Sequence, residues 1–447
     1  MKSPFSFDGE LTRPAYLMAS TAVLFAQHLF TWLVFAVACE PLETPWWFWL
    51  NPLRALVTAS GPLPVWTMPT AMILTLIVDG LLVALAFRRA QNARGYTGFA
   101  ALLVAPILQA PVILLLTLAP RRREAAPTPA EAFGRPSPRV AVRGLLVGAT
   151  LSVGAVLLST LALHLYGYGL FIASPFVIGL TTAYLANRES DLGPGWTTSV
   201  VFTALMLGGV ALIGFALEGV ACLVLAAPLI AAMGYVGGLF GRALARGGRR
   251  RGGPALMSIA FVPLLLVGET ALPPKAAFDS TESVDIAATP AAVWEAVVHM
   301  GPIPDAPAVP FRWGLAYPMR GEILGTGLGA IRRGVFSTGV AYERVTEWEP
   351  QRKLSFIVLS DPPTMRELSP YQHVNAPHVL GYFRTEYARF TITPLSDGKT
   401  RLSLATRHEL DLEPALYWIP IAEWATHANK VRVLEHFRRQ AEAAGGA

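Results

Sequence analysis

Long apolar stretches fill the first 272 residues, and this feature most constrains what the chain can fold into. Seven or eight stretches qualify, at residues 15–39, 67–87, 97–119, 142–165, 168–186, 197–217, 219–241 and the shorter 254–272. A helix needs about 20 mainly apolar residues to cross the hydrocarbon core of a bilayer. Charged residues make up only 15% of the chain, against about 25% in an ordinary soluble protein. The sequence therefore excludes a purely soluble protein and predicts a multi-pass α-helical membrane region.

Basic residues of the apolar half gather in its loops. The first 275 residues carry a net charge of +8, whereas the remaining residues carry −2. Excess Lys and Arg in short loops marks the cytoplasmic side of a membrane protein and does not indicate nucleic-acid binding. If the arginine-rich segment 121–141 is cytoplasmic, the next four spans return Arg242–Arg251 to the cytoplasm. The eighth stretch, 254–272, then crosses once more and places the C-terminal domain outside the cytoplasm. The sequence thus predicts a multi-pass protein of the cell inner membrane with an extracytoplasmic C-terminal domain.

Changes in composition divide the chain into four segments. Residues 1–120 form an N-terminal membrane subdomain, 121–141 a Pro/Arg-rich linker, 142–272 a second membrane subdomain and 276–447 a soluble domain. The topology of the first segment stays open, because Arg88–Arg94 and Arg121–Arg123 cannot both be cytoplasmic if residues 97–119 cross once. Either that stretch is re-entrant or residues 46–60 hide another crossing.

After residue 273 the hydrophobic pattern becomes that of a mixed α+β domain. Thr289-Pro290 is typical of a helix start, and Asp397-Gly398 is a strong hairpin signal. Strands are predicted at residues 282–288, 329–336, 339–345, 353–359, 382–393 and 400–410. Residues 419–444 are predicted to form one long amphipathic helix whose inner side carries Ile421, Trp424, Val431, Leu434 and Phe437. The expected layout is a short helix, an antiparallel sheet and a long closing helix.

Several short motifs in this C-terminal segment match those of a known superfamily. They are Val284-Asp285-Ile286, Thr289-Pro290-Ala291-Ala292-Val293-Trp294, Gly325-Thr326-Gly327, Tyr342-Glu343-Arg344-Val345, Trp348-Glu349-Pro350 and Leu354-Ser355-Phe356. With them, residues 276–447 resemble the SRPBCC superfamily (START-like, polyketide cyclase/dehydrase type). The resemblance implies a helix-grip fold, in which an antiparallel sheet wraps the long C-terminal helix and leaves a deep apolar cavity. It implies a hydrophobic small molecule or lipid as ligand, and it says almost nothing about chemistry.

The N-terminal region carries two further motifs. They run from Phe7 to Tyr16 (FDGELTRPAY) and from Arg88 to Phe99 (RRAQNARGYTGF). These motifs resemble the domain-of-unknown-function 805 family of small bacterial inner-membrane proteins. That family usually has His-Asp where this chain has Gln91-Asn92, and tryptophan in place of Phe99. The family has no established activity, so the resemblance implies a membrane location alone.

Polar and aromatic residues of the soluble domain are the candidate contacts in the implied cavity. The candidates are Trp313, Tyr317, His378, Tyr382, Arg384, Glu386, His408, Trp424 and His427. Of these, His378, Glu386 and His408 could act as acid or base groups in a cavity. The alternative is that all of them are loop and sheet-surface residues. Trp313 and Tyr317 lie in an aromatic loop that either forms a lid at the membrane or folds over the core.

Motifs for a catalytic set, a cofactor or a metal are absent from the sequence. No two histidines have metal-ligand spacing with a carboxylate nearby, and the sequence contains no Gly-x-Ser-x-Gly elbow, phosphate loop or dinucleotide motif. Cys39 and Cys222 lie in apolar runs, so neither a disulfide framework nor a cysteine metal site is expected. The sequence predicts no cofactor and no metal, and it favours a non-catalytic role.

Two acidic residues, Asp79 and Glu218, lie within or next to predicted spans. A charged side chain at the bilayer centre costs about 3 kcal/mol, so such residues face a protein interior or a polar cavity. They either line a proton or ion pathway, or pair with another span and with headgroups.

The sequence supports three hypotheses for function. The preferred one is a membrane-tethered helix-grip domain that binds a hydrophobic small molecule or lipid. The first alternative is a cyclase- or hydrolase-type enzyme that uses the cavity, and the second is a multi-pass transporter or sensor with a regulatory soluble domain. Neither the ligand nor the oligomeric state can be derived from the sequence.

Overall fold

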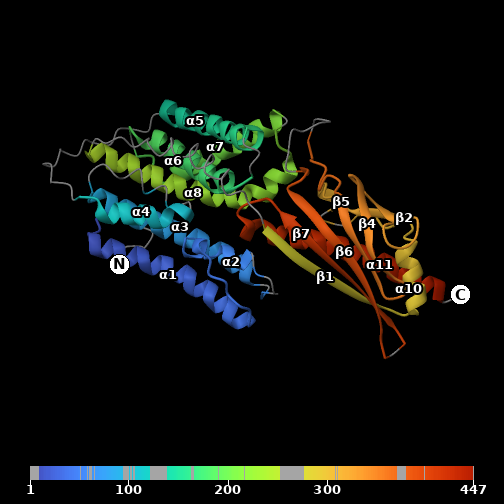
Figure 1. Cartoon of the computed structure of the whole chain (residues 1–447). Coiled ribbons are helices and arrows are strands. Elements are labelled where there is room, and N and C mark those ends of the chain that lie inside the picture. The colour runs from blue at the N-terminus through green and yellow to red at the C-terminus, as the bar shows by residue number, and fades with distance from the viewer. Residues whose placement is uncertain are drawn as a thin grey trace. The chain divides into compact units, whose positions relative to one another are not determined.

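The computed structural model divides the chain into two compact units, one up to Pro273 and one from Pro274 onward (Figure 1). We call them the N-terminal unit and the C-terminal unit. The described residues are 10–50, 52–57, 59, 63–64, 66–93, 100, 103, 106–120, 138–162, 166–189, 191–215, 217–251, 276–307, 309, 311–369, 379–396 and 398–445. Most of the predicted linker and the predicted span 254–272 lie outside them.

The first part of the N-terminal unit is helical. Its elements are α1 (Arg13–Ala38), the short η1 (Trp46–Trp49) and α2 (Arg54–Val57), α3 (Thr67–Gln91) and α4 (Pro106–Leu118). Two arginines hold these helices together at the end of α4, where helix carbonyls have no partner of their own. Arg13 donates to the Ala119 carbonyl at 2.9 Å, and the fully buried Arg89 donates to the same oxygen at 2.6 Å. A cation there is stabilised by the negative end of the helix dipole.

A second group of helices completes the N-terminal unit. It comprises α5 (Pro138–Val156), η3 (Leu157–Ala162), η4 (Gly169–Ala173), α6 (Ser174–Asn187), α7 (Pro194–Gly214) and α8 (Val220–Arg251). Glycines let α8 approach α6 closely: a Cβ on Gly237 would lie 2.0 Å from the Phe176 carbonyl oxygen, and one on Gly241 would lie 2.1 Å from that of Leu180. Packing through small residues is typical of helices associated within membranes.

Within the described ranges, four helical segments are long and apolar enough to cross a membrane: Arg13–Ala38, Gly169–Asn187, Pro194–Gly214 and Val220–Gly247. They correspond to four of the predicted stretches. Of the stretch 97–119, residues Pro106–Leu118 form α4, and most of the residues before Pro106 lie outside the described ranges. The stretch 142–165 changes from α-helix to π-helix at Leu157, and 67–87 lies within α3.

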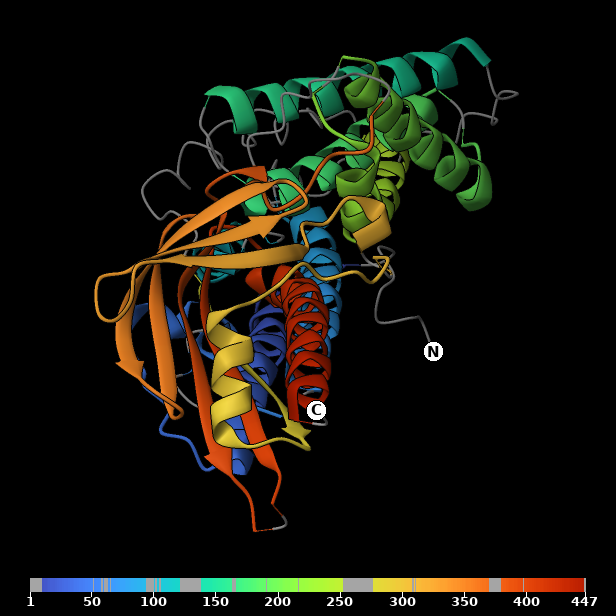
Figure 2. The same ribbon diagram turned by 90° about the vertical axis from the view of Figure 1, so that its right-hand side faces the viewer.

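The C-terminal unit is built on one seven-stranded antiparallel sheet with the order β1-β7-β6-β5-β4-β3-β2. The strands are β1 (Ala276–Ile286), β2 (Pro318–Leu324), β3 (Ile331–Phe336), β4 (Gly339–Glu349), β5 (Lys353–Ser360), β6 (Phe383–Pro394) and β7 (Thr400–Leu410). The helices are α10 (Pro290–Val298), the short η6 (Phe311–Trp313) and α11 (Ala415–Gly445). Figure 2 shows α10 and α11 beside each other along the curved sheet, and both pack on it. This is the predicted START-like layout.

Most predicted elements of this unit are present, and the differences have physical reasons. Thr289 caps α10, accepting a hydrogen bond from the Ala292 N–H at 3.3 Å. Strand β2 was not predicted, because its sequence, PMRGEIL, contains Pro and Gly and does not alternate apolar with polar residues. On α11, Leu434 and Phe437 are buried, but Trp424 and Val431 are 42% and 45% exposed. The prediction for those two was wrong, because the helix turns them away from the sheet.

Apolar side chains gather at one end of the inner face of the sheet, which is the face toward α10 and α11. Leu402 and Leu404 of β7 and Phe390 of β6 pack there with Leu434 and Phe437 of α11. Phe390 meets Phe437 edge-to-face with ring centroids 5.6 Å apart, a geometry that aromatic pairs prefer. This end of the unit is a conventional core.

Candidate functional site

Polar side chains occupy the inner face of the sheet beyond that core. Along β7 the even-numbered residues alternate inward, and they change from Leu402 and Leu404 to Thr406 and His408. Thr406 and His408 are only 8% and 4% exposed. Because buried polar groups are costly without hydrogen bonds, their partners determine what this region can do.

His408 is held by two threonines. Its Nε2 lies 2.8 Å from Thr406 Oγ1, and its Nδ1 lies 3.2 Å from Thr385 Oγ1 on β6. The Thr406 hydroxyl donates to the Ser280 carbonyl of β1 at 3.3 Å, so its oxygen is free to accept from Nε2–H. Burial, together with the nearby Lys430 charge, lowers the pKa of His408 to about 3. The ring is therefore neutral at physiological pH.

Lys430 reaches the same region from α11. It is 4% exposed, and its Nζ donates to Ser280 Oγ. Burial lowers the pKa of Lys430 to about 8, against the opposing effect of Glu282 and Glu423. Among the described residues no carboxylate lies within ion-pair distance of Nζ. An ammonium has three donors, and a lysine is rarely buried without a charged partner.

Asp361, just after β5, extends these contacts. Its Oδ2 accepts from the Thr385 backbone N–H at 3.1 Å. Burial raises the pKa of Asp361 to about 6, and the neighbouring Glu343 adds to the increase. A series of contacts thus crosses four strands to α11, and we call it the polar network: Asp361, Thr385, His408, Thr406, Ser280 and Lys430.

A buried ion pair lies on the inner face of β3 and β4. Arg332 donates to the Glu343 carboxylate, and both side chains are at least nine-tenths buried. The guanidinium also lies 4.7 Å from the centre of the Phe356 ring and 3.7 Å from the Met300 sulfur. Burial raises the pKa of Glu343 although Arg332 opposes the rise. Removing one partner of such a pair strongly destabilises the fold, because the other charge is left buried without a partner.

Of the residues selected from the sequence, His408 is the one that lies in the polar network. Arg384 and Glu386 are on the outer face, where Arg384 pairs with Glu409 at 2.9 Å and Glu386 with Arg407 at 3.1 Å. A bulge in β6 after Thr385 shifts the alternation. The alternate spacing of Arg384 and Glu386 therefore does not point into the domain.

The other candidates lie around the edge of the C-terminal unit. His427 on α11 is exposed, and its Nδ1 lies 2.6 Å from Glu282. Tyr317 is half-buried, with the Arg432 guanidinium 5.2 Å from its ring. Trp313 and Trp424 are 50% and 42% exposed. Burial and the Asp411 charge raise the pKa of Tyr382, and His378 lies outside the described residues.

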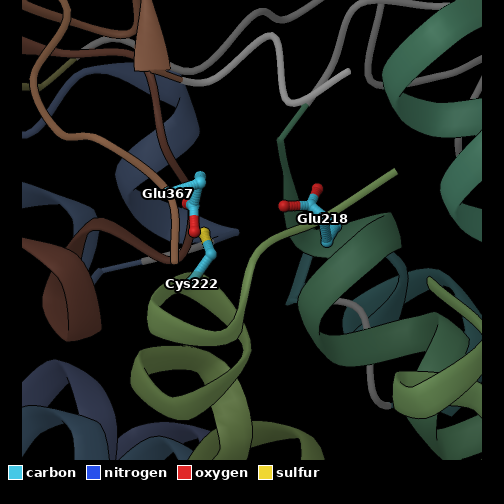
Figure 3. Close-up of side chains that lie close together, drawn as sticks. All are labelled: Glu218, Cys222 and Glu367. Carbon is cyan, nitrogen blue, oxygen red and sulfur yellow. The ribbon is translucent and has the colours of Figure 1, made fainter. Parts of the chain in front are cut away.

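Asp79 and Glu218, the two acidic residues at predicted spans, both have hydrogen bonds. Asp79 of α3 is 2% exposed, and its Oδ1 accepts from Gln109 Nε2 of α4 at 2.9 Å. Glu218 lies just before α8 and accepts from the Tyr166 hydroxyl at 3.2 Å. Figure 3 labels Glu218, which precedes α8, and Cys222, which lies in the first turn of α8; Glu367, also labelled there, belongs to the C-terminal unit. The hydrogen bond of Asp79 joins two helices of one unit, α3 and α4.

Lys430, Thr406 and Asp361 were missed by sequence reasoning, although two of them left a signal. Lys430 lies four and seven residues before the buried Leu434 and Phe437, so it shares their helix face. Thr406 continues the inward alternation of β7. A lysine on a core face is the pattern that identifies such a site. Asp361 gave no comparable signal, because its place depends on where β5 ends.

No protein-family model and no curated protein matches the chain. A START superfamily protein from Mycobacterium smegmatis aligns with 38% of this chain and 97% of its own, at 16% identity and a TM-score of 0.24. A protein from Mesorhizobium loti aligns with 36% of this chain and 97% of its own, at 17% identity and a TM-score of 0.23. The Aha1 dimer from Colwellia psychrerythraea aligns with 36% of this chain and 96% of its own, at 11% identity and a TM-score of 0.22.

The topology of the C-terminal unit confirms the predicted α+β layout. A short helix follows the first strand, six further strands complete an antiparallel sheet, and a long helix closes the chain. The N-terminal resemblance to the domain-of-unknown-function 805 family has no counterpart in these comparisons.

Proposed function

We propose that the C-terminal unit binds a hydrophobic small molecule or lipid, and that the N-terminal unit anchors it in the cell inner membrane. The observation that carries this proposal is the polar network, which lies inside the helix-grip next to the apolar core. Ligand pockets combine apolar walls with a few placed polar groups. Here the Phe278 and Phe383 rings beside His408 supply apolar surface, and Thr406 and His408 supply polar groups.

A binding role fits these residues better than catalysis does. A general base works best when its pKa lies near the working pH, whereas the pKa of His408 is about 3. Glu386, the other described acid/base candidate, lies on the outer face with Arg407. A transporter role gains no support from Asp79, since Gln109 accounts for it as a contact between two helices.

The membrane assignment is supported by the surface of the N-terminal unit. Besides the four candidate spans, α1 exposes large apolar side chains, with Met18 and Val37 exposed to 73% and 65%. Contiguous exposed apolar surface of this kind marks a lipid or protein interface. Asp191, between α6 and α7, pairs with Arg242 through two contacts of 2.8 and 2.9 Å. By the charge rule that end of the helices is cytoplasmic.

Ligand binding is tested by purifying the full chain from membranes and identifying bound molecules by native mass spectrometry. We expect the wild type to retain a hydrophobic molecule and Thr406→Phe, which fills the inner face, to lose it. Ala405→Phe places the same ring on the opposite face of β7 and should keep the ligand. The proposal fails if no molecule is retained by correctly folded wild-type protein, or if both variants retain it equally.

The side of the membrane is tested with a cysteine at Arg352, an exposed position in the β4–β5 turn. In a chain with Cys39 and Cys222 replaced by serine, a membrane-impermeant maleimide should label Arg352→Cys in intact spheroplasts. Labelling that appears only after lysis would place the C-terminal unit in the cytoplasm.

A further inference from the structure

Lys430 is a buried cation without an opposite charge in contact with it. Its side chain is 4% exposed, and Ser280 Oγ accepts its hydrogen bond. The full ammonium has two more N–H donors. Burying a charge without a partner is costly, so a protein interior either neutralises such a group or supplies it with a counter-charge.

The two carboxyl groups nearest Lys430, Glu282 and Glu423, raise its pKa, but neither is within ion-pair distance of Nζ, and the effect of burial outweighs both. Glu282 of β1 is engaged by His427, with its oxygen 2.6 Å from the imidazole. Glu423 lies two turns earlier on α11, and burial raises its pKa, which favours its neutral form. His408 of β7 is neutral, as described above. The position next to Nζ therefore lacks an anion from this unit, among its described residues.

We propose that Lys430 binds the carboxylate of a long-chain monocarboxylic acid, whose apolar chain lies in the helix-grip. This inference rests on the proposed function and names the chemical class of the ligand. The carboxylate supplies one negative charge to one ammonium, and its oxygens accept from Nζ and from the hydroxyl of Ser280. Charge-assisted hydrogen bonds of this kind are short and strong.

A monocarboxylate fits the site better than a phosphate does. A phosphate monoester carries nearly two negative charges and three acceptor oxygens. Lys430 is the only cation of the polar network, so the second charge of a phosphate would be buried without a partner. The aromatic rings of Phe278 and Phe383, centred 5.2 and 4.9 Å from the His408 ring, offer apolar surface for the chain of the acid.

The test compares three probes that differ only in their head: decanoic acid, decan-1-ol and methyl decanoate. Each is titrated into the full-length chain, delipidated in detergent, and adducts are counted by native mass spectrometry near pH 7. We expect decanoic acid to bind the wild type, and Lys430→Met to weaken that binding by at least about 30-fold, the lower end of the usual cost of removing one partner of a buried charge pair. The two neutral probes should change by less than about threefold.

Two further variants serve as controls. Lys399→Met removes the charge of an exposed lysine and should leave all three affinities unchanged. Lys430→Arg keeps the charge and should retain preference for the acid over the alcohol. It also separates loss of charge from loss of packing, because Met and Arg both keep a long side chain.

The outcomes separate this inference from the function on which it rests. If the acid and the alcohol bind wild type and Lys430→Met equally, the C-terminal unit binds hydrophobic molecules and the carboxylate assignment is wrong. If a decyl phosphate binds more tightly than decanoic acid, the head group is a phosphate and the assignment is again wrong. If none of the probes binds the folded wild type, the proposed function itself is refuted for this class of ligand.

Discussion

Replacing Lys430 by methionine should make the C-terminal unit more stable, and the gain should depend on pH. Lys430 is buried, and burial lowers its pKa from 10.5 to about 8. Below pH 8 the ammonium is charged in both the folded and the unfolded chain, so the full cost of burying the charge opposes folding. As the pH rises through 8 toward 10.5 the folded chain releases its proton first, and that cost disappears. In Lys430→Met the side chain is uncharged at every pH, so no charge has to be buried when the chain folds.

The size of the effect follows from the shift. A fall of the pKa from 10.5 to about 8 is equivalent to about 3 kcal/mol at most. Water still screens part of the ammonium, so we expect about 1–3 kcal/mol in practice. For a unit of this size, that corresponds to a rise of about 3–10 °C in the midpoint of thermal unfolding. In Lys430→Met, Ser280 loses a hydrogen-bond partner, which subtracts about 1 kcal/mol from the expected gain in stability.

The assay is thermal unfolding of the full chain in one detergent, followed by the near-ultraviolet signal of the C-terminal aromatics. Wild type, Lys430→Met and Lys399→Met are compared near pH 7 and again near pH 10. We expect the advantage of Lys430→Met near pH 7 to shrink near pH 10, and Lys399→Met to follow the wild type at both. A Lys430→Met chain that is less stable than wild type near pH 7 would show that the ammonium stabilises the fold, and the reasoning would be wrong.

Four further substitutions test other parts of the structure by thermal unfolding of the full chain, followed for the two in α8 by the far-ultraviolet helical signal. Asp361→Asn should stabilise the chain by about 1–2 kcal/mol near pH 7 and by little near pH 4. The pKa of Asp361 is raised to about 6 in the folded chain, so the wild type loses stability as the pH rises from 4 through 6. The same gain at both pH values would contradict this. Glu343→Gln should cost about 3–5 kcal/mol by leaving Arg332 buried without its partner, and a neutral effect would show that water reaches the pair. Gly237→Ala should cost about 1–3 kcal/mol, since its Cβ would meet a backbone oxygen at 2.0 Å. Gly247→Ala, on the same helix with open space around it, should instead gain up to about 1 kcal/mol.

Much of the C-terminal fold could be predicted because local patterns specified it. Thr289-Pro290 gave the start of α10, and the alternation in residues 400–410 gave β7 with its inward face. These patterns depend only on neighbours in the chain. Residues 384 and 386 show the limit of such reasoning, since a single bulge in β6 moved them to the outer face. Alternation predicts a face only while the strand stays regular.

The candidate site was predicted only in part. His408 was selected for its chemistry, and it is buried in the polar network. Lys430 was passed over, because a lone lysine on a helix is usually solvated. Its role depends on which face of α11 meets β1, and Ser280 is 150 residues away in the sequence.

The division into an apolar helical half and an α+β half follows from segment length and periodicity, which depend on hydrophobicity alone. The long closing helix and the hairpin before β7 follow from local patterns as well. Which polar groups share one interior depends on contacts between distant parts of the chain. The pairing of β1 with β7, and the packing of α11 across them, bring Ser280, His408 and Lys430 together from three elements. Burial then changes their chemistry: a lysine and a histidine that would both be charged or easily titrated in water lose protons more readily inside, because an apolar interior disfavours their charged forms.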